Sequence, residues 1–491
     1  MTPGRRRLAW AGSRDRATIA IPVGLLLVGL IATLYRIGSK SIWYDESLSV
    51  RHATSALEPF LSDVVGRDTN GILYFLILRP WILVFGEGEG AIRALSALFA
   101  VATVLLVYAI GARLLGRWAG LAAAVLLLAS RMTVEYAQEA RAYSMAMAFA
   151  TLGTWLVLEL GASTSRWRRI GYAVVMGLGV YTHLFVAFVF AAHLLWLALR
   201  AAGHTGATTW RHVVEIGVVF AVVAAPMALF ALIGNGPDWV RPLSSDTLTW
   251  TFLGLAGDSW ALVAVALIAL GMAVVYVVRD RDRPDPVWDG LELILLWAVV
   301  PIAIGVAISV VRSMLVTRYF LVTLPAFSLL VVFACSRLRW RPAAVVAYGL
   351  VLVLSLVPTI SWYTAASRAN WRTLTQEVAA ASSSGDRVAF YEPHQRSAFD
   401  YYLRRFDLDD EAPRLLAPGD LAAIAASTDP GARPARIWLV LSYQYTGVTP
   451  PALATMLDEL EAAGYRPTGK DRTFGAVRFR LMVDEDRPPP P

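Results

Sequence analysis

Two aromatic residues precede two carboxylates, Asp45 and Glu46, in the stretch at 42–46. Tryptophan and tyrosine favour the membrane–water interface, so these carboxylates should lie at headgroup depth. A helix that starts here would place Asp45, Ser49 and His52 on one face. A carboxylate held in this way can take a proton from a hydroxyl as a general base. Alternatively, Asp45 is only the N-cap of an interfacial helix, with Glu46 interacting with its dipole.

A second charged motif lies between 135 and 143. Glu135 and Glu139 are four residues apart, which places them on one helix face, and Arg141 follows them. These groups could hold a substrate or a divalent cation, and for a cation the carboxylates of Asp45 and Glu139 are the candidate ligands. The alternative is an ion pair within the motif, Glu139–Arg141 or Glu135–Arg131.

Basic and aromatic residues recur at two later positions. Arg312 and Arg318 flank a turn, Tyr319 follows at a helix start, and His183 lies at the end of an apolar run. Arginine presents a planar fork that suits a phosphate. The alternatives are arginines that extend to lipid headgroups and a histidine that is simply satisfied at the interface. Arg372, after Trp371, is a further minor candidate.

The elements that must position these residues are mostly membrane helices. The chain has 491 residues, of which 57% are hydrophobic and 16% charged, and a soluble protein would carry about 25% charge. The net charge of +7 comes from arginines in short loops, which indicates membrane orientation and not nucleic-acid binding. The single cysteine, Cys335, excludes an internal disulfide and a cysteine metal site.

We expect about eleven spans, since each needs about 20 apolar residues. The N-terminal run is interpreted as a retained helix and not as a cleaved signal peptide, because no suitable cleavage site follows it. The expected spans are Ala17–Tyr35, Ile92–Ala112, Trp118–Met132, Ser144–Gly161, Ile170–Thr182, Leu184–Leu199, His212–Ile233, Ser259–Val278, Leu291–Val311, Tyr319–Ser336 and Pro342–Ile360.

The segment Ile72–Phe85 decides the side of every loop. At about 14 residues it would extend only about 21 Å as a helix, which is short for a bilayer. If it does not cross, every arginine-rich loop joins the basic N-terminus, residues 1–16, on the cytoplasmic side. It is therefore interpreted as a juxtamembrane or re-entrant helix. The outer face then receives Asp45, Glu46, Asp68 and Asn70 of loop 36–70, together with Glu135, Glu139, Arg141, His183, Arg312 and Arg318.

Beyond the membrane module at 17–360, the composition predicts a small extracytoplasmic α/β domain at 361–486. Strands are expected at Arg387–Tyr391, Ile437–Leu441 and Ala476–Met482. Helices are expected at Trp371–Ala381, Pro451–Ala463 and Leu421–Ala426. The proline-rich tail at 487–491 is predicted to be disordered.

The motifs occur in an order that resembles the dolichyl-phosphate-mannose-type mannosyltransferase family and its bacterial relatives, the aminoarabinose transferases. The resemblance is clearest up to about residue 200. The matching pieces are Ile42-Trp43-Tyr44-Asp45-Glu46, Leu73-Tyr74-Phe75-Leu76, Val84-Phe85-Gly86, Glu89 through Arg93 to Ala97, Leu115-Gly116-Arg117-Trp118-Ala119-Gly120, Glu139-Ala140-Arg141-Ala142-Tyr143, Tyr181-Thr182-His183, and Arg318-Tyr319 before Leu324-Pro325.

The resemblance implies a superfamily-C membrane glycosyltransferase fold and a polyprenyl-phosphate sugar donor. It implies that Asp45 is the catalytic carboxylate, that Glu139 or Glu135 is a second acidic element, and that Arg318 is the first candidate for the donor phosphate. Relatives often carry a His or Lys with Pro-Pro before the Leu-Tyr pair. This chain has 68–72 as Asp-Thr-Asn-Gly-Ile, so no role of that basic residue is carried over to Asn70 or Asp68.

The reaction expected is a single, inverting displacement. Asp45 would deprotonate the hydroxyl of a glycan, lipid or protein acceptor at the outer face of the plasma membrane. The sugar, mannose or a similar one, cannot be derived from the sequence. A lipid or solute transporter is the main alternative, although the centres of the spans are nearly free of charge. A non-catalytic scaffold would leave the outer charged residues without a role.

Overall fold

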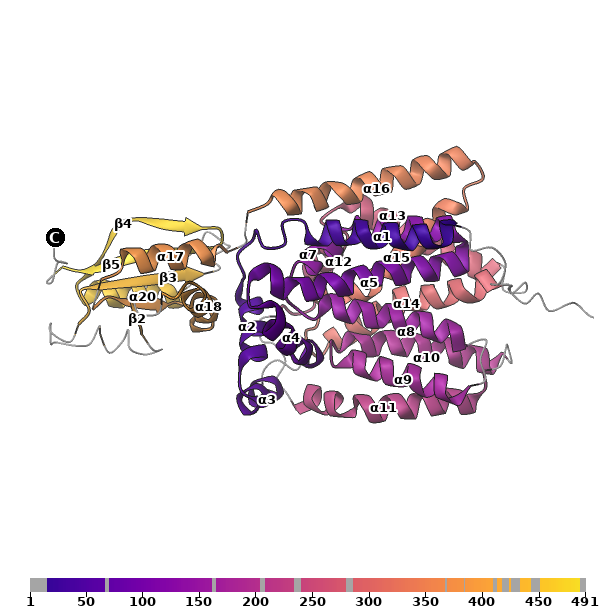
Figure 1. The fold of residues 1–491 in the computed structure, drawn as a ribbon, viewed down its shortest axis with the longest axis horizontal. Coiled ribbons are helices and arrows are strands. Elements are labelled where there is room, and N and C mark those ends of the chain that lie inside the picture. Colours follow the sequence, from indigo (N-terminus) through magenta and orange to yellow (C-terminus); the bar gives the residue numbers. More distant parts are fainter. Residues whose placement is uncertain are drawn as a thin grey trace, which may run out of the picture. The chain divides into compact units, whose positions relative to one another are not determined.

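The computed structural model describes residues 16–485 apart from 67–69, 161–164, 204–207, 234–239, 280–285, 367–368, 384, 409–412, 417–423, 425–432 and 443–450 (Figure 1). The chain divides into two compact units. The membrane unit comprises 1–37, 56–84 and 92–364, and the sheet unit comprises 38–55, 85–91 and 365–491. The sheet unit thus includes two pieces of chain that the sequence analysis assigns to the membrane module.

The membrane unit is a bundle of helices (Figure 1). Among the described residues, eight helices are long and apolar enough to cross a membrane, or nine if the pair α6–α7, bent by 64°, forms one span. The helices are α1 (Arg16–Leu34), α3 (Leu57–Gly66), α4 (Ile72–Phe85), α5 (Glu89–Leu115), α6 (Arg117–Leu128), α7 (Arg131–Ala137), α8 (Tyr143–Leu160), α9 (Arg166–Val180), α10 (Phe185–Ala202), α11 (Trp210–Ile233), α12 (Ser245–Leu255), α13 (Trp260–Arg279), α14 (Pro286–Ser309), the 3-10 helix η1 (Thr317–Thr323), α15 (Leu324–Ser336) and α16 (Arg341–Thr364).

Within the described residues, fewer helices meet this length and hydropathy criterion than the eleven spans expected. The helix α9 has only 15 residues, and its first turn is arginine-rich. The apolar part of α1, Ile19–Leu34, is also shorter than the spanning helices. The predicted fold class, a polytopic helical membrane protein with a small C-terminal α/β region, is confirmed.

Ion pairs tie helix ends together at one end of this bundle. Arg113 near the end of α5 pairs with Glu159 near the end of α8. Arg169 in α9 lies 2.8 Å from Glu215 in α11. Arg200 near the end of α10 lies 2.6 Å from Asp289 in α14. The arginine-rich turns therefore share one end of the bundle.

The end of α1, which precedes α4, and the start of α5, which follows it, both lie at the end of the bundle opposite to these ion pairs. The side-chain amide of Gln138, which follows α7, donates to the carbonyl of Thr33 at the end of α1 over 3.0 Å. Arg93, in the first turns of α5, donates from Nη1 to the carbonyl of Ile37 over 2.9 Å. The end of α1 and the start of α5 are thus neighbours, as the non-crossing interpretation of Ile72–Phe85 requires.

The sheet unit contains a five-stranded sheet in the order β2-β1-β3-β5-β4. The strand β1 is parallel to β2 and β3, whereas β5 is antiparallel to β3 and β4. Its elements are α2 (Tyr44–Thr54), α17 (Trp371–Ala381), β1 (Arg387–Phe390), the 3-10 helix η2 (Pro393–Gln395), α18 (Arg396–Phe406), β2 (Arg414–Leu415), β3 (Arg436–Ser442), α20 (Pro451–Ala462), β4 (Tyr465–Phe474) and β5 (Val477–Asp484).

The three predicted strands correspond to β1, β3 and β5, and two predicted helices correspond to α17 and α20. The helix α18 and the edge strands β2 and β4 were not predicted from the sequence. The predicted helix Leu421–Ala426 lies almost wholly outside the described residues, as does the tail at 487–491.

Candidate functional site

Two arginines from separate segments of the membrane unit meet at a cluster of aromatic rings. Arg318 lies in η1, and its guanidinium carbon is 5.7 Å from the ring centre of Tyr143, the first residue of α8. Arg141 lies in the turn before α8, and its guanidinium carbon is 5.8 Å from the ring of Phe75. Tyr319 stacks on Tyr143 with ring centres 6.4 Å apart. The turn before α8 and η1 therefore each place a guanidinium group beside an aromatic ring.

His183 completes this cluster from the loop between α9 and α10. Its ring centre lies 4.6 Å from that of Tyr319 and 5.7 Å from that of Tyr143. Its Nδ1 accepts a hydrogen bond from the backbone N–H of Phe185 over 3.2 Å, so the proton of the neutral ring is on Nε2. Among the described residues, Nε2 has no hydrogen-bond partner although the side chain is buried.

The charge of this cluster favours an anion. Burial lowers the pKa of His183 to about 3, and the positive charges of Arg141 and Arg318 add to that effect. The imidazole is therefore neutral at physiological pH and offers an N–H donor beside two guanidinium groups. Such a set of donors suits phosphate or carboxylate oxygens. We define these three residues, His183, Arg141 and Arg318, as the donor triad.

Replacing His183 with Gln should make the stability of the folded chain less sensitive to acid. The pKa of His183 is lowered from 6.5 to about 3 on folding, so the unfolded chain binds a proton that the folded chain does not. Stability contributed by the neutral ring is therefore lost as the pH falls below about 6.5. Thermal unfolding of purified protein between pH 7.5 and pH 5 measures this. An equal fall in melting temperature in both proteins would contradict a buried neutral imidazole.

The start of α4 supports the loop that carries His183. Asn70 accepts a hydrogen bond at Oδ1 from the backbone N–H of Leu184 over 3.3 Å. The backbone N–H of Leu73 donates to the carbonyl of Tyr181 over 3.1 Å. Asn70 thus holds the triad's loop through its amide oxygen, although the sequence could not assign it a role.

The acidic residues of the 135–143 motif are arranged in part as an ion pair. Glu135 is buried and accepts a hydrogen bond from Arg131 Nε over 3.1 Å, and Arg131 also lies 2.6 Å from Asp258. Glu139 is buried as well. Within the described part of the chain, no group of three His, Cys, Asp or Glu side chains is arranged to hold a metal ion. Asp45 and Glu139, the candidate ligands, belong to different units.

Of two further candidates, the structure describes only Arg312. Arg312 is exposed in the turn after α14, six residues before Arg318. Asp68 lies outside the described residues. Conversely, Tyr143 and Phe75 face the two guanidinium groups but were not predicted as site residues, although both belong to the motifs that carry the family resemblance. Their aromatic character within those motifs was the available signal.

Asp45 and Glu46 lie in the first turn of α2, in the sheet unit. The N-cap of α2 is Trp43, which makes no side-chain capping bond, so Asp45 is not the N-cap. Asp45 is half-buried, Glu46 is buried, and Ser49 donates its hydroxyl to the carbonyl of Asp45 over 3.0 Å. The carboxylate of Asp45 thus lies in the first turn of α2, where a negative charge favours the helix dipole.

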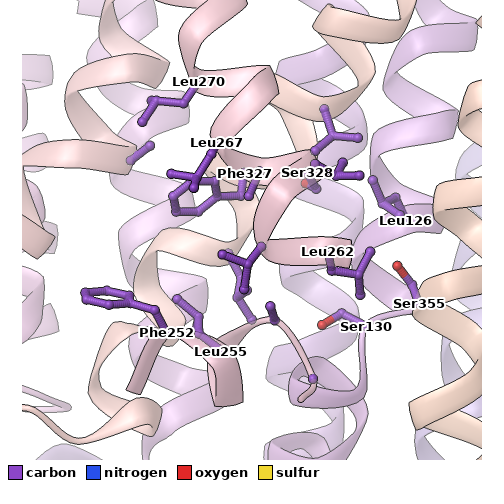
Figure 2. Close-up of a pocket in the computed structure, with 18 of the residues that line it drawn as sticks. Leu126, Ser130, Phe252, Leu255, Leu262, Leu267, Leu270, Phe327, Ser328 and Ser355 are labelled. Carbon is purple, nitrogen blue, oxygen red and sulfur yellow. The ribbon is translucent and has the colours of Figure 1, made fainter. Parts of the chain in front are cut away.

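An apolar cavity of about 410 Å³ lies within the membrane unit (Figure 2). It is lined by α6 and by α12 to α16, and most of its labelled side chains are leucine or phenylalanine. Phe252 lines it and contacts Phe320 of η1, with ring centres 5.8 Å apart. Phe320 is two residues from Arg318, so one residue of the cavity wall packs against the segment that carries Arg318.

Residues 69–230 match the family described as dolichyl-phosphate-mannose-protein mannosyltransferase. This range includes Asn70, Arg141 and His183 but neither Asp45 nor Arg318. No match was found among curated protein sequences. The resemblance stated from the motifs is thus supported by an independent match over a third of the chain.

Solved structures share the fold of the whole chain. One is ArnT from Cupriavidus metallidurans in the apo state, with 15% identity, a TM-score of 0.61, and coverage of 97% of this chain and 100% of that one. The same protein bound to undecaprenyl phosphate has 13% identity and a TM-score of 0.60, with coverage of 96% of this chain and 99% of that one. A third structure is the oligosaccharyltransferase AglB from Archaeoglobus fulgidus, in complex with an inhibitory peptide and a dolichol-phosphate. It has 10% identity and a TM-score of 0.54, with coverage of 86% of this chain and 69% of that one. The superfamily-C fold and the resemblance to its mannosyltransferase families are confirmed.

Proposed function

From the match to the mannosyltransferase family and the superfamily-C fold, we propose that this membrane protein is a glycosyltransferase that takes a sugar from a polyprenyl-phosphate donor. One observation carries the proposal: two guanidinium groups act on one neutral imidazole N–H in the membrane unit, and the same unit contains an apolar cavity. An anionic head joined to a long apolar chain has the chemistry that this pair of features requires. Solved relatives of the same fold are described as bound to undecaprenyl phosphate and dolichol-phosphate.

The donor triad would stabilise the phosphate as it leaves the sugar. Negative charge develops on the phosphate oxygens when the bond to the anomeric carbon breaks, and preorganised donors lower the energy of that state. Arg141 and Arg318 supply charge, and Nε2–H of His183 supplies a neutral donor. The rings of Tyr143 and Phe75 restrict the two guanidinium groups, which reduces the reorganisation needed when the donor binds.

Asp45 is proposed as the general base, as the family resemblance implies. It would take the proton of the acceptor hydroxyl while that oxygen attacks the anomeric carbon, so a single displacement inverts the centre. The acceptor would be a glycan, a lipid or a protein. Mannose is the sugar that the family match suggests.

We also propose an orientation in the plasma membrane. The arginine-rich turns at one end of the membrane unit would face the cytoplasm, following the positive-inside tendency. The donor triad, at the opposite helix ends, would then face outward, and the 361–486 region would be extracytoplasmic. Cysteine labelling from each side of intact cells, at single cysteines introduced in a Cys335→Ser background, tests this placement.

The central experiment supplies purified protein with a panel of polyprenyl-phosphate sugars and measures donor consumption. We expect at least one donor to be cleaved, with release of polyprenyl phosphate, and the rates with and without a chelator test whether a divalent cation takes part. Failure of every donor in the panel, with protein that is folded by its melting curve, would contradict the proposal. Movement of an intact donor across a vesicle membrane without cleavage would instead support the transporter alternative.

Filling the apolar cavity should weaken the use of long-chain donors. Ala266 lines the cavity, so Ala266→Phe should raise the KM for a long polyprenyl donor roughly tenfold by competing with the lipid for space. A short-chain analogue should be affected little. Ala264→Phe is the matched control, since Ala264 is exposed on the same helix. Equal effects on both donors would show that the cavity does not receive the lipid.

A further inference from the structure

A buried network in the sheet unit joins three segments that are far apart in the sequence. Glu89 accepts hydrogen bonds at Oε1 from Arg372 Nε over 3.0 Å and from Arg372 Nη2 over 2.7 Å. The same oxygen accepts from the hydroxyl of Tyr402 over 3.0 Å. Tyr402 is fully buried, and the side chain of Glu89 is 14% exposed. A carboxylate with three donors in this setting is held in one orientation.

The network also holds the backbone that leads into α2. The hydroxyl of Tyr402 accepts hydrogen bonds from the backbone N–H of Ile42 over 2.9 Å and from Ser41 Oγ over 3.1 Å. Arg372 donates from Nη2 to the carbonyl of Gly38 over 3.0 Å. The backbone N–H of Arg372 donates to Ser41 Oγ over 3.2 Å. Residues 38–42 are therefore tied to α17 and α18 by four hydrogen bonds.

The first turn of α2 makes its own contacts with the same region. The hydroxyls of Ser47 and Ser397 lie 2.8 Å apart. The rings of Tyr44 and His394 meet edge to face, with centres 4.8 Å apart. Asp45 lies between Tyr44 and Ser47 on this turn. Its backbone is consequently held from the preceding residues 38–42 and, within the first turn, from Tyr44 and Ser47.

The hydroxyl of Tyr402 keeps its proton over the working range of pH. Burial and then the negative charge of Glu89 raise its pKa to about 12. It can therefore donate to Glu89 and accept from Ile42 at the same time. Loss of this one oxygen removes the link between the Glu89–Arg372 pair and the residue three positions before Asp45.

We propose that Glu89, Arg372 and Tyr402 are positioning residues that hold Asp45 in the orientation required for proton transfer. This inference rests on the proposed role of Asp45 as general base. It assigns to the C-terminal helices α17 and α18 a part in the reaction, because they supply two of the three members. A shift of about 1 Å in a reacting group can lower a rate about a hundredfold, so a modest loosening should be measurable.

The test compares Tyr402→Phe in two backgrounds, the natural chain and Asp45→Asn. In the natural chain we expect kcat to fall roughly tenfold or more, with the KM for the donor unchanged, because only the base is displaced. In the Asp45→Asn chain, the same change should produce no further loss, because the base that it positions is absent. A sensitive radiolabelled donor permits the residual rates to be compared.

Tyr401→Phe is the matched control. Tyr401 is buried on the same helix, and its hydroxyl donates to the carbonyl of Glu87 over 2.6 Å, away from residues 38–42. It should lower the melting temperature about as much as Tyr402→Phe while leaving kcat near that of the natural chain. Glu89→Gln, which keeps the shape but loses the charge, provides a second variant if Tyr402→Phe does not fold.

The outcomes separate this inference from the proposed function. A natural kcat in folded Tyr402→Phe and Glu89→Gln would overturn the positioning role. So would an equal fractional loss in both backgrounds, since the tyrosine would then act independently of Asp45. If Asp45→Asn alone keeps the natural rate, it is the assignment of the base, on which the inference rests, that fails.

Discussion

Replacing Asp45 with Asn should lower sugar transfer by about 10²–10⁴-fold, the range typical of losing a positioned general base. Asparagine has nearly the same size as aspartate but cannot take a proton from the acceptor hydroxyl. Asp45 is neither the N-cap of α2 nor fully buried, so loss of its charge in the first turn should cost only about 1 kcal/mol or less. The folded state should therefore be kept, and the loss should appear in kcat with little change in the KM for the donor.

The measurement is the initial rate of product formation at saturating donor, with the melting temperature as a check on folding. Glu58→Gln is the matched control, because Glu58 is an exposed carboxylate of the same predicted outer loop. It should leave the rate unchanged. Transfer by Asp45→Asn at the natural rate would mean that another group, of which buried Glu46 is the nearest in sequence, takes the proton.

Much of the fold follows from patterns that are local in the sequence. Hydropathy predicts Ser259–Val278 as a span, and the structure has α13 at Trp260–Arg279. Apolar runs likewise predict β3 and β5, which lie inside the sheet with a strand on each side. The edge strand β4 was missed, since it has only one neighbour and contains Pro467, Gly469 and Lys470, which are poor strand formers.

The site residues divide in the same way. Arg318 and His183 could be predicted from their residue types and from their predicted place on the outer side of the membrane, because arginine and histidine at the outer ends of spans are unusual. The pairing of Glu89 with Arg372 could not, since 283 residues separate them and no local pattern relates them. Tyr402 lies in α18, a helix that was not predicted from the sequence. Long-range hydrogen bonds of this kind are set by the tertiary fold.

Replacing Arg318 with Ala should lower kcat/KM for the donor by about 10²–10³-fold, the cost of losing one preorganised donor to a developing anion. Arg141→Ala should have an effect of similar size. Lysine should restore little at either position, because it lacks the planar fork that can bind two phosphate oxygens. The two arginines flank one imidazole, so the double variant should lose less than the product of the two single effects.

Inhibition by free polyprenyl phosphate separates phosphate binding from other roles of these arginines. If they bind the phosphate, each alanine variant should raise the inhibition constant of the free lipid phosphate along with the KM of the donor. Arg117→Ala is the control, since Arg117 is exposed at the other end of the helices, where its guanidinium carbon lies 5.4 Å from the ring of Trp118. If both arginine variants have a lower rate but an unchanged inhibition constant for the free lipid phosphate, the arginines act in a later step. The phosphate would then bind elsewhere in the chain.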